Sequence, residues 1–279
     1  MFNDQPVSAA RRKYLKAKKR DKWLIQLFRV LIFAVVVALW EICTRNGMLD
    51  PFIFSSPARI IKTVGSLFAT GNLLTHIAYT LFETVLGFLI GTGLGVLIAV
   101  ILWWCPRAAK VIDPYLVILN SLPKIALGPV LIVWIGTGIP AIVTIAVLVS
   151  VIVSIASIST GFAAVPEEKL TLMRSFGATK LQMLHMVVLP ANVPAIVSAL
   201  KLSVGLSWVG VIVGEFLISR AGLGYLIVYG GQVFKLDIVM SSVVILCTLA
   251  GVMYYLVSLM ERRVTRRRLQ KKGGAPKRK

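Results

Sequence analysis

Residues 139–163 read IPAIVTIAVLVSVIVSIASISTGFA and contain no charged side chain. A helix needs about 20 mostly apolar residues to cross a bilayer, so this stretch is long enough to span one. Further stretches of this kind lie at about 24–43, 77–104, 113–135, 193–218 and 236–260. Lipid cannot satisfy open backbone groups, and these runs lack the polar–apolar alternation of barrel strands. The sequence therefore predicts an all-α integral membrane protein with six transmembrane helices.

The composition agrees with a membrane protein. The 279 residues are 57% hydrophobic and 15% charged, whereas soluble domains are about 45–50% apolar and about 25% charged. The formal net charge is +20, and the Lys and Arg residues gather in the tails 1–23 and 261–279. Basic flanks beside apolar spans are typical of cytoplasmic anchors that contact anionic membrane lipid. Such short tails argue against a nucleic-acid-binding fold, so we expect no nucleic-acid partner.

The basic residues between the apolar stretches predict the orientation. The links 105–112 and 164–190 carry Lys and Arg residues, and both chain tails carry many more. On the opposite side the longer link 44–76 has Arg45, Arg59 and Lys62, the link 136–138 has none, and the last link has Arg220 and Lys235. Six spans with both chain ends in the cytoplasm satisfy this positive-inside bias. The loop 164–190 is therefore expected on the cytoplasmic side, and the link 44–76 on the outer side.

Two of the outer links have a predicted local structure. Ser55 or Ser56 with Pro57 predicts the start of a short helix that covers Ala58 to Phe68. The link Gly136-Thr137-Gly138 is so short that its two spans should form a tight helical hairpin. The expected parts of the chain are a basic tail at 1–23, a first helix with its outer link at 24–76, a five-helix core at 77–260 and a basic tail at 261–279.

The loop 164–190 has an amphipathic pattern. Apolar or small residues recur at spacings of three and four and would share one helix face, namely Leu170, Met173, Gly177, Leu181 and Leu184. A glycine in the middle of that face permits a turn between two short helices or the close approach of another backbone. Amphipathicity alone leaves open whether the loop binds a partner or lies on the lipid headgroups. Pro190 and Pro194 mark the entrance to the next span, where proline costs little.

The spacing within this loop resembles a known family motif. Gly177-Ala178 is followed, twelve and thirteen residues after the glycine, by Leu189-Pro190. This pattern resembles the cytoplasmic "EAA" loop of ABC-importer permeases, through which such permeases engage their ATPase subunits. Leu184 also falls on the pattern. Thr171-Leu172-Met173 stands where Glu-Ala-Ala would be, which is a departure from it.

Two further segments resemble a narrower family. Leu122 to Pro129 reads LPKIALGP and is followed by WIGTG at 134–138; Gly214-Glu215 is followed by GLGYLI at 222–227. Both look like signatures of nitrate/sulfonate/taurine-type permeases. The resemblance covers about residues 55–260 and rests on three motifs in the same order.

The resemblance implies a type I ABC importer permease fold in a bacterial cell (inner) membrane, multi-pass, with both termini cytoplasmic. The implied partners are ABC ATPase subunits, a second permease copy and an extracytoplasmic solute-binding protein. ATP and Mg would bind the partner ATPase, and no cofactor is expected on this chain, which is a transport subunit and not an enzyme. The implied ATPase-coupling residues are Thr171, Met173, Arg174, Gly177, Ala178, Leu181, Leu184, Leu189 and Pro190.

Ionisable side chains at membrane depth are costly and usually face protein or water. Lys124 falls near the middle of the third span, and a cation there suits a small anionic solute. The candidate pathway residues are Asn120, Ser121, Pro123, Lys124 and Glu215. A structural alternative pairs Lys124 with a backbone carbonyl or with Glu83. Glu215 would pair with Arg220 or contact a neighbouring subunit or binding protein.

Small residues predict where helices pack closely. Gly87, Gly91 and Gly95 are spaced by four in the second span. The fourth span carries a run of hydroxyl side chains at Ser150, Ser154, Ser157, Ser159 and Thr160. We expect both sets to pack against neighbouring helices rather than to contact solute.

No catalytic or metal-ligating pattern is present in the sequence, and no phosphate-binding Gly-x4-Gly-Lys-Ser/Thr motif. An alternative to the importer subunit is an ion-coupled secondary transporter that acts without an ATPase, in which Lys124 and Glu215 carry the coupling charge. A channel or a membrane scaffold is a third possibility. The sequence leaves open which solute is carried and whether the permease forms a homodimer or a heterodimer.

Overall fold

The computed structural model describes residues 9–273, without the side chains of 9–13, 15, 16, 19, 22 and 264–273; the outermost parts of both basic tails lie outside the described residues. Every regular element in the described part is helical, which confirms the predicted all-α class. The α-helices are α1 (Ala9–Arg45), α2 (Pro51–Phe54), α3 (Pro57–Ala69), α4 (Asn72–Trp104), α5 (Pro106–Ser121), α6 (Gly128–Ile135), α7 (Ile139–Ala163), α8 (Glu167–Ser175), α9 (Lys180–Met183), α10 (Leu189–Ile218), α11 (Leu223–Gln232) and α12 (Leu236–Gly273).

The chain divides into two compact units, at Met1–Thr63 and Val64–Lys279. In the first unit, α1 carries an apolar stretch over Trp23–Arg45 that is long enough to cross a membrane. Near its end, the Glu41 carboxylate accepts hydrogen bonds from Arg45 Nε (2.7 Å) and from the Ala58 backbone N–H (3.1 Å). This carboxylate therefore links the end of α1 to the first turn of α3, the short helix that the sequence predicts.

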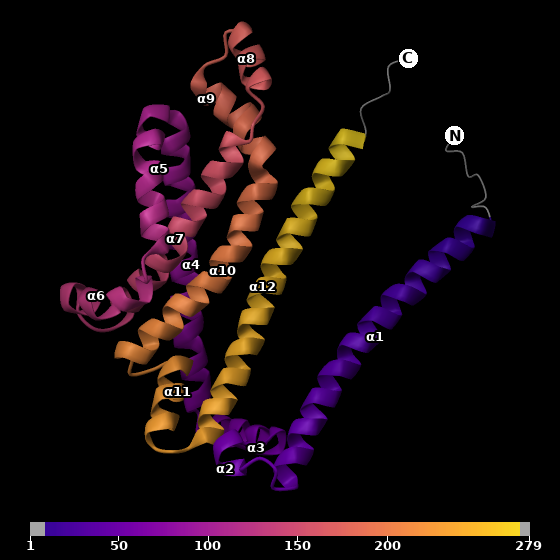
Figure 1. Ribbon diagram of the computed structural model, residues 1–279, viewed down its shortest axis with the longest axis vertical. Coiled ribbons are helices and arrows are strands. Elements are labelled where there is room, and N and C mark those ends of the chain that lie inside the picture. Colours follow the sequence, from indigo (N-terminus) through magenta and orange to yellow (C-terminus); the bar gives the residue numbers. More distant parts are fainter. Residues whose placement is uncertain (1–8, 274–279) are drawn as a thin grey trace. The chain divides into compact units, whose positions relative to one another are not determined.

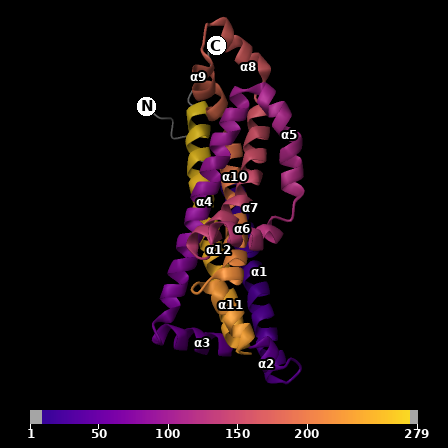
Figure 2. The ribbon, with the colours of Figure 1, turned by 90° about the vertical axis from the view of Figure 1, so that its left-hand side faces the viewer.

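The second unit is a helical bundle centred on α7, which packs along both α4 and α10. Helix α12 packs on α10 and α11, and an ion pair between Lys201 of α10 and Glu261 of α12 joins the two helices. The short helices α8 and α9 lie at one end of the bundle and α11 lies at the opposite end (Figures 1 and 2). The bundle thus has two distinct ends that are connected by α7 and α10.

Small side chains allow the central helices to touch, as predicted. A Cβ atom added at Gly87 of α4 would lie 2.8 Å from the Ala146 Cβ of α7, and one added at Gly91 or Gly95 would collide with a serine of α7. Ser154, the serine opposite Gly95, also contacts α10, because its hydroxyl is hydrogen-bonded to the Ser203 hydroxyl at 2.7 Å. Ser154 therefore packs between helices and does not face an open pathway.

The predicted span 113–135 is not one continuous helix. Helix α5 ends at Ser121, a 3₁₀ turn covers Lys124–Leu127, and the axes of the two halves, Pro106–Ser121 and Lys124–Ile135, meet at 85°. Pro123 causes the break, because it has no N–H and disfavours helical geometry at the residue before it. Among the described residues, five helices are long and apolar enough to cross a membrane, or six if this bent pair counts as one span.

The turn between α6 and α7 has the tight geometry that its two glycines predict. Gly136 and Gly138 have φ values of +89° and +106°, which residues with a side chain rarely adopt. Helix α6, which ends just before this turn, packs on α7, which begins just after it. The predicted hairpin therefore forms, with α6 as its short arm.

The close contact between α7 and α10 predicts a sharp difference between two glycines of α10. A Cβ at Gly210 would lie 2.5 Å from the Ala146 Cα, whereas a Cβ at Gly205 has no atom within 4 Å. We expect Gly210→Ala to lower the free energy of unfolding by about 1–3 kcal/mol, because backbone atoms must move to make room. The matched variant Gly205→Ala should leave it unchanged or raise it by up to about 1 kcal/mol. Thermal unfolding of the purified protein in detergent measures both, and equal melting temperatures for the two variants would contradict the packing.

Candidate functional site

The loop 164–190 folds into two short helices joined by a tight turn. Helix α8 ends where Gly177 adopts φ +73°, with hydrogen bonds from Gly177 N–H to the Arg174 carbonyl (2.9 Å) and from Ala178 N–H to the Met173 carbonyl (3.0 Å). This pair of bonds is the Schellman arrangement that ends a helix at a left-handed residue. No atom lies within 4 Å of a Cβ placed on Gly177, so the glycine serves the turn and not a close backbone approach.

Helix α9 begins with a reciprocal cap. The Thr179 hydroxyl accepts from the Gln182 backbone N–H at 3.3 Å, and the Gln182 side-chain oxygen accepts from the Thr179 N–H at 2.7 Å. Together these bonds satisfy two backbone donors that the first turn of a helix leaves unpaired. The two helices of the loop are therefore held by local hydrogen bonds on both sides of Gly177.

One face of the loop packs on the bundle. Leu170, Met183 and Leu184 are buried and join a cluster with Ala99 of α4 and Phe162 of α7. Partly buried side chains extend this contact, among them Met173, Ala178 and Leu189. The loop is thus seated on the ends of α4 and α7 by an apolar contact.

The other face of the loop exposes large apolar side chains to solvent. Phe176 is 77% exposed and Leu181 is 64% exposed, and Leu172 and Met186 are exposed as well. The prediction that Leu181 shares a face with Leu170 and Leu184 is therefore wrong. The turn at Gly177 separates Leu170 from Leu181, and after this turn Met183 and Leu184 pack on the bundle while Leu181 is exposed.

Helix α9 continues into α10 through a π-helical segment at Leu184–Val188. Pro190 lies in the first turn of α10 as predicted, whereas Pro194 lies inside that helix. A wider helical turn often occurs where prolines or other disturbances interrupt the α-helical hydrogen bonds. Because residues 180–218 form one connected helical stretch, the loop is joined to α10 without a flexible linker.

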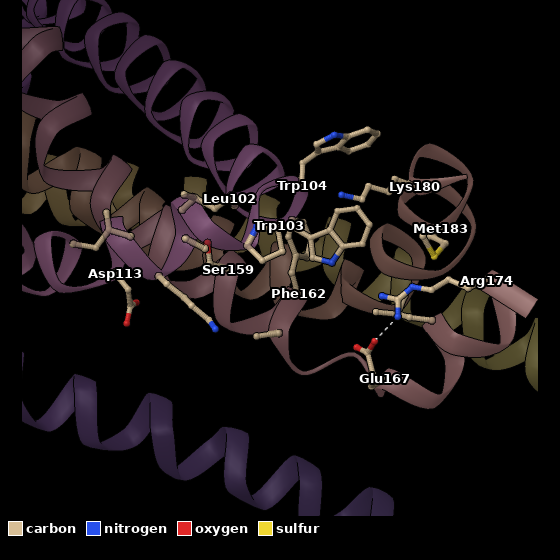
Figure 3. A pocket seen from close by; sticks show the side chains of 17 residues that line it. Leu102, Trp103, Trp104, Asp113, Ser159, Phe162, Glu167, Arg174, Lys180 and Met183 are labelled. Atoms are coloured by element: carbon tan, nitrogen blue, oxygen red, sulfur yellow. Dashed lines mark hydrogen bonds and ion pairs between the residues drawn. The ribbon is translucent and has the colours of Figure 1, made fainter. Parts of the chain in front are cut away.

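A cavity of about 430 Å³ separates the loop from α5. Its wall includes Trp103 and Phe162, and Figure 3 shows the ion pair between Arg174 and Glu167, with the Lys180 side chain nearer to the rings of Trp103 and Trp104. The distance from Arg174 Nη1 to Glu167 Oε1 is 2.9 Å. The cavity is therefore bordered by the loop, by α5 and by the ends of α4 and α7.

The predicted pathway residues at the break of the third span come together only in part. The Lys124 ammonium donates to the backbone oxygen of Asn120 at 3.2 Å and to its side-chain oxygen at 3.3 Å. Ser121 donates to the Val117 carbonyl of its own helix at 3.0 Å. Pairing of Lys124 with a carbonyl, one of the structural alternatives, is thus present, and no ion pair with Glu83 is formed.

Glu215, the remaining candidate, binds the start of α11. Its side chain is only 1% exposed. Oε2 accepts from Gly224 N–H at 2.5 Å, Oε1 accepts from the Thr80 hydroxyl at 2.6 Å, and the Tyr225 N–H also donates to the carboxylate. A carboxylate at this place satisfies unpaired amides and complements the positive end of the helix dipole. The predicted pairing with Arg220 is therefore wrong.

The two glycines of the GLGYLI motif leave room for this carboxylate. Gly222 has φ +115°, and a Cβ at Gly222 or Gly224 would collide with the Glu215 side chain. Two residues of α4 that also bind this turn were not found from the sequence. Thr80 accepts from Leu223 N–H at 2.8 Å, and His76 Nδ1 accepts from Gly222 N–H at 2.9 Å. Both partners lie more than 140 residues from the amides they bind, so no local pattern could have indicated them.

Within residues 9–273, no three His, Cys, Asp or Glu side chains are grouped so that they could hold a metal ion.

Comparison with known proteins identifies the family. Residues 91–269 match the family described as "Binding-protein-dependent transport system inner membrane component". The chain is 27% identical over 247 residues to the "Putative aliphatic sulfonates transport permease protein SsuC" of Bacillus subtilis, which covers 88% of each chain. It is 30% identical over 227 residues to the "Probable ABC transporter permease protein" of Haemophilus influenzae, which covers 81% of this chain and 91% of that one.

A solved structure has the same fold. It is that of a bacterial ABC transporter involved in the import of the acidic polysaccharide alginate, with a TM-score of 0.63 and 18% identity over 91% of this chain and 99% of that one. This similarity supports the predicted type I importer permease fold. The family match covers more than half of the chain, including all of α7, the loop 164–190 and α10. The chain therefore belongs to the family of binding-protein-dependent transport system inner membrane components, the permeases of ABC importers.

Proposed function

We propose that this chain is the transmembrane permease subunit of an ATP-driven importer and forms the translocation pathway for a small anionic solute of the sulfonate, taurine or nitrate type. The observation that carries the proposal is the loop 164–190, which exposes an apolar face at one end of the bundle and continues directly into α10. The similarity to a sulfonate transport permease supports the solute class. An extracytoplasmic solute-binding protein would deliver the solute, and the membrane would be a bacterial inner membrane with both chain ends in the cytoplasm.

The exposed face of the loop is the proposed contact for an ABC ATPase. Thr171, Arg174, Phe176 and Leu181 are exposed and available to a partner. The other predicted coupling residues shape the loop: Gly177 makes its turn, and Met173, Ala178, Leu184, Leu189 and Pro190 pack on the bundle or lie at the junction with α10. An exposed apolar face that includes an aromatic residue is suited to a protein partner.

The proposed mechanism is an alternation between two states. ATP, bound with Mg by the partner ATPases and not by this chain, closes the ATPase dimer and draws together the loops of two permease copies. Because α9 continues into α10, movement of the loop reaches the opposite end of the bundle, where α11 lies. The pathway then opens toward the binding protein, and hydrolysis reverses the change.

The ion-coupled transporter has less support. It needs Lys124 and Glu215 to carry a coupling charge together, yet Lys124 binds Asn120 and Glu215 binds the start of α11. Uptake driven by an ion gradient without ATP would favour it over the importer.

Phe176 provides the direct test of the ATPase contact. We expect Phe176→Ser to reduce solute-dependent ATP hydrolysis of the reconstituted complex at least tenfold, because a central apolar anchor is lost from the interface. Phe176→Leu keeps an apolar side chain and should retain most of the activity. Pull-down from native membranes should recover a stoichiometric ATPase with the wild type and the leucine variant only. Equal activity of the serine variant would contradict an ATPase contact at this face.

Gly177 provides a second test, of the turn itself. A branched side chain at φ +73° is strained by about 1–2 kcal/mol, whereas asparagine tolerates this conformation. We therefore expect Gly177→Val to insert into the membrane but to lose most coupled ATP hydrolysis, and Gly177→Asn to keep it. If the two variants hydrolyse ATP equally well, the geometry of the turn does not matter for coupling.

A further inference from the structure

The cavity beside the loop 164–190 has no role in the proposed ATPase contact. Its volume is about 430 Å³, and Arg174 is the single predicted coupling residue in its lining. Cavities of about 300–1,000 Å³ are typical of small-molecule sites. The cavity is therefore large enough to hold a ligand of its own.

The charged side chains around this cavity leave a positive charge without a partner. They are Lys110 and Asp113 of α5, Glu167 and Arg174 of α8, and Lys180 of α9. Arg174 and Glu167 bind each other at 2.9 Å. The other three are exposed and form no ion pair with any side chain that the structure describes. Because two lysines stand against one aspartate, the cavity favours an anionic ligand.

Lys180 is placed where a positive charge does not help its own helix. It is the first residue of the helical stretch Lys180–Ile218, and the dipole at the start of a helix disfavours a cation. Its side chain lies toward the rings of Trp103 and Trp104 (Figure 3). The ammonium group is thus held over an aromatic wall of the cavity.

The two tryptophans indicate the depth of the cavity in the membrane. Trp103 and Trp104 are the last residues of α4, which is long and apolar enough to cross a membrane. Tryptophan at the end of a membrane-spanning helix lies at the level of the lipid headgroups. Leu102 and Phe162 add a buried apolar wall beside the rings. The cavity thus combines a cationic rim with an apolar wall at headgroup depth, which suits an amphiphile better than a hydrated ion.

We propose that this cavity binds the headgroup of an anionic phospholipid, whose phosphate group pairs with Lys110 and Lys180. Basic pockets between membrane-spanning helices bind such headgroups. Because the two lysines belong to α5 and α9, the bound headgroup joins α5 to the loop 164–190. The inference goes beyond the proposed import function and requires neither the ATPase nor the solute.

The test is native mass spectrometry of the delipidated full-length permease in detergent, titrated with phosphatidylglycerol or with phosphatidylcholine. We expect the wild type to bind one phosphatidylglycerol at least tenfold more tightly than phosphatidylcholine, which has no net charge. Lys110→Gln combined with Lys180→Gln should weaken phosphatidylglycerol binding at least tenfold and leave phosphatidylcholine binding unchanged. If the double variant does not fold, each single variant decides instead, with an expected weakening of at least threefold.

The matched control is Arg107→Gln combined with Lys169→Gln. It removes the same charge from α5 and from the loop, but from residues that do not line the cavity. It should leave phosphatidylglycerol binding unchanged, and the basic tails attract anionic lipid alike in all variants. Equal weakening by the two double variants, or no weakening by the Lys110 and Lys180 variant, would overturn the proposal. Displacement of the lipid by inorganic phosphate would also overturn it, because the site would then bind a free anion.

Discussion

The bundle depends on the close approach of α4, α7 and α10. Inside a membrane the hydrophobic effect does not drive helices together, because lipid tails are as apolar as the side chains. Helix association there relies on van der Waals contact between small residues and on a few hydrogen bonds. Gly87 and Gly210 each bring their helix against Ala146, and the Ser154–Ser203 bond joins α7 to α10. The loop 164–190 follows directly from α7 and returns into α10, so this packing also fixes where the loop stands.

The same three helices place two different kinds of chemistry at the two ends of the bundle. At one end, the turn at Gly177 leaves Phe176 and Leu181 exposed while Leu170 stays buried. At the other end, Glu83 and Glu215 form a buried polar group beside a cavity. Helix α10 runs between the ends, with the loop before its first residue and Glu215 near its last turn. Events at one end can thus reach the other through a single element.

The elements with a local signal were predictable from the sequence. The apolar spans, the small-residue contacts and the short helix α3 all follow from composition, period or a special residue, and a turn was one of the two roles expected of Gly177. Three features did not. The 85° bend required knowing that the chain turns at Pro123 instead of kinking. The exposure of Leu181 depended on which side of α9 packs on the bundle. The partners of Glu215 come from Thr80 and α11, far apart in the chain. In each case, tertiary structure decided among locally acceptable alternatives.

The cap that Glu215 provides for α11 has a mechanical consequence. Most helices are capped by a side chain just before their first turn, but α11 is capped by a carboxylate from the preceding long helix and by a hydroxyl from α4. If α11 swung away from α10, several amides would lose their acceptors in surroundings where water is scarce. The junction between α10 and α11 is therefore rigid. Any rearrangement at this end of the bundle must rotate the two helices as one body.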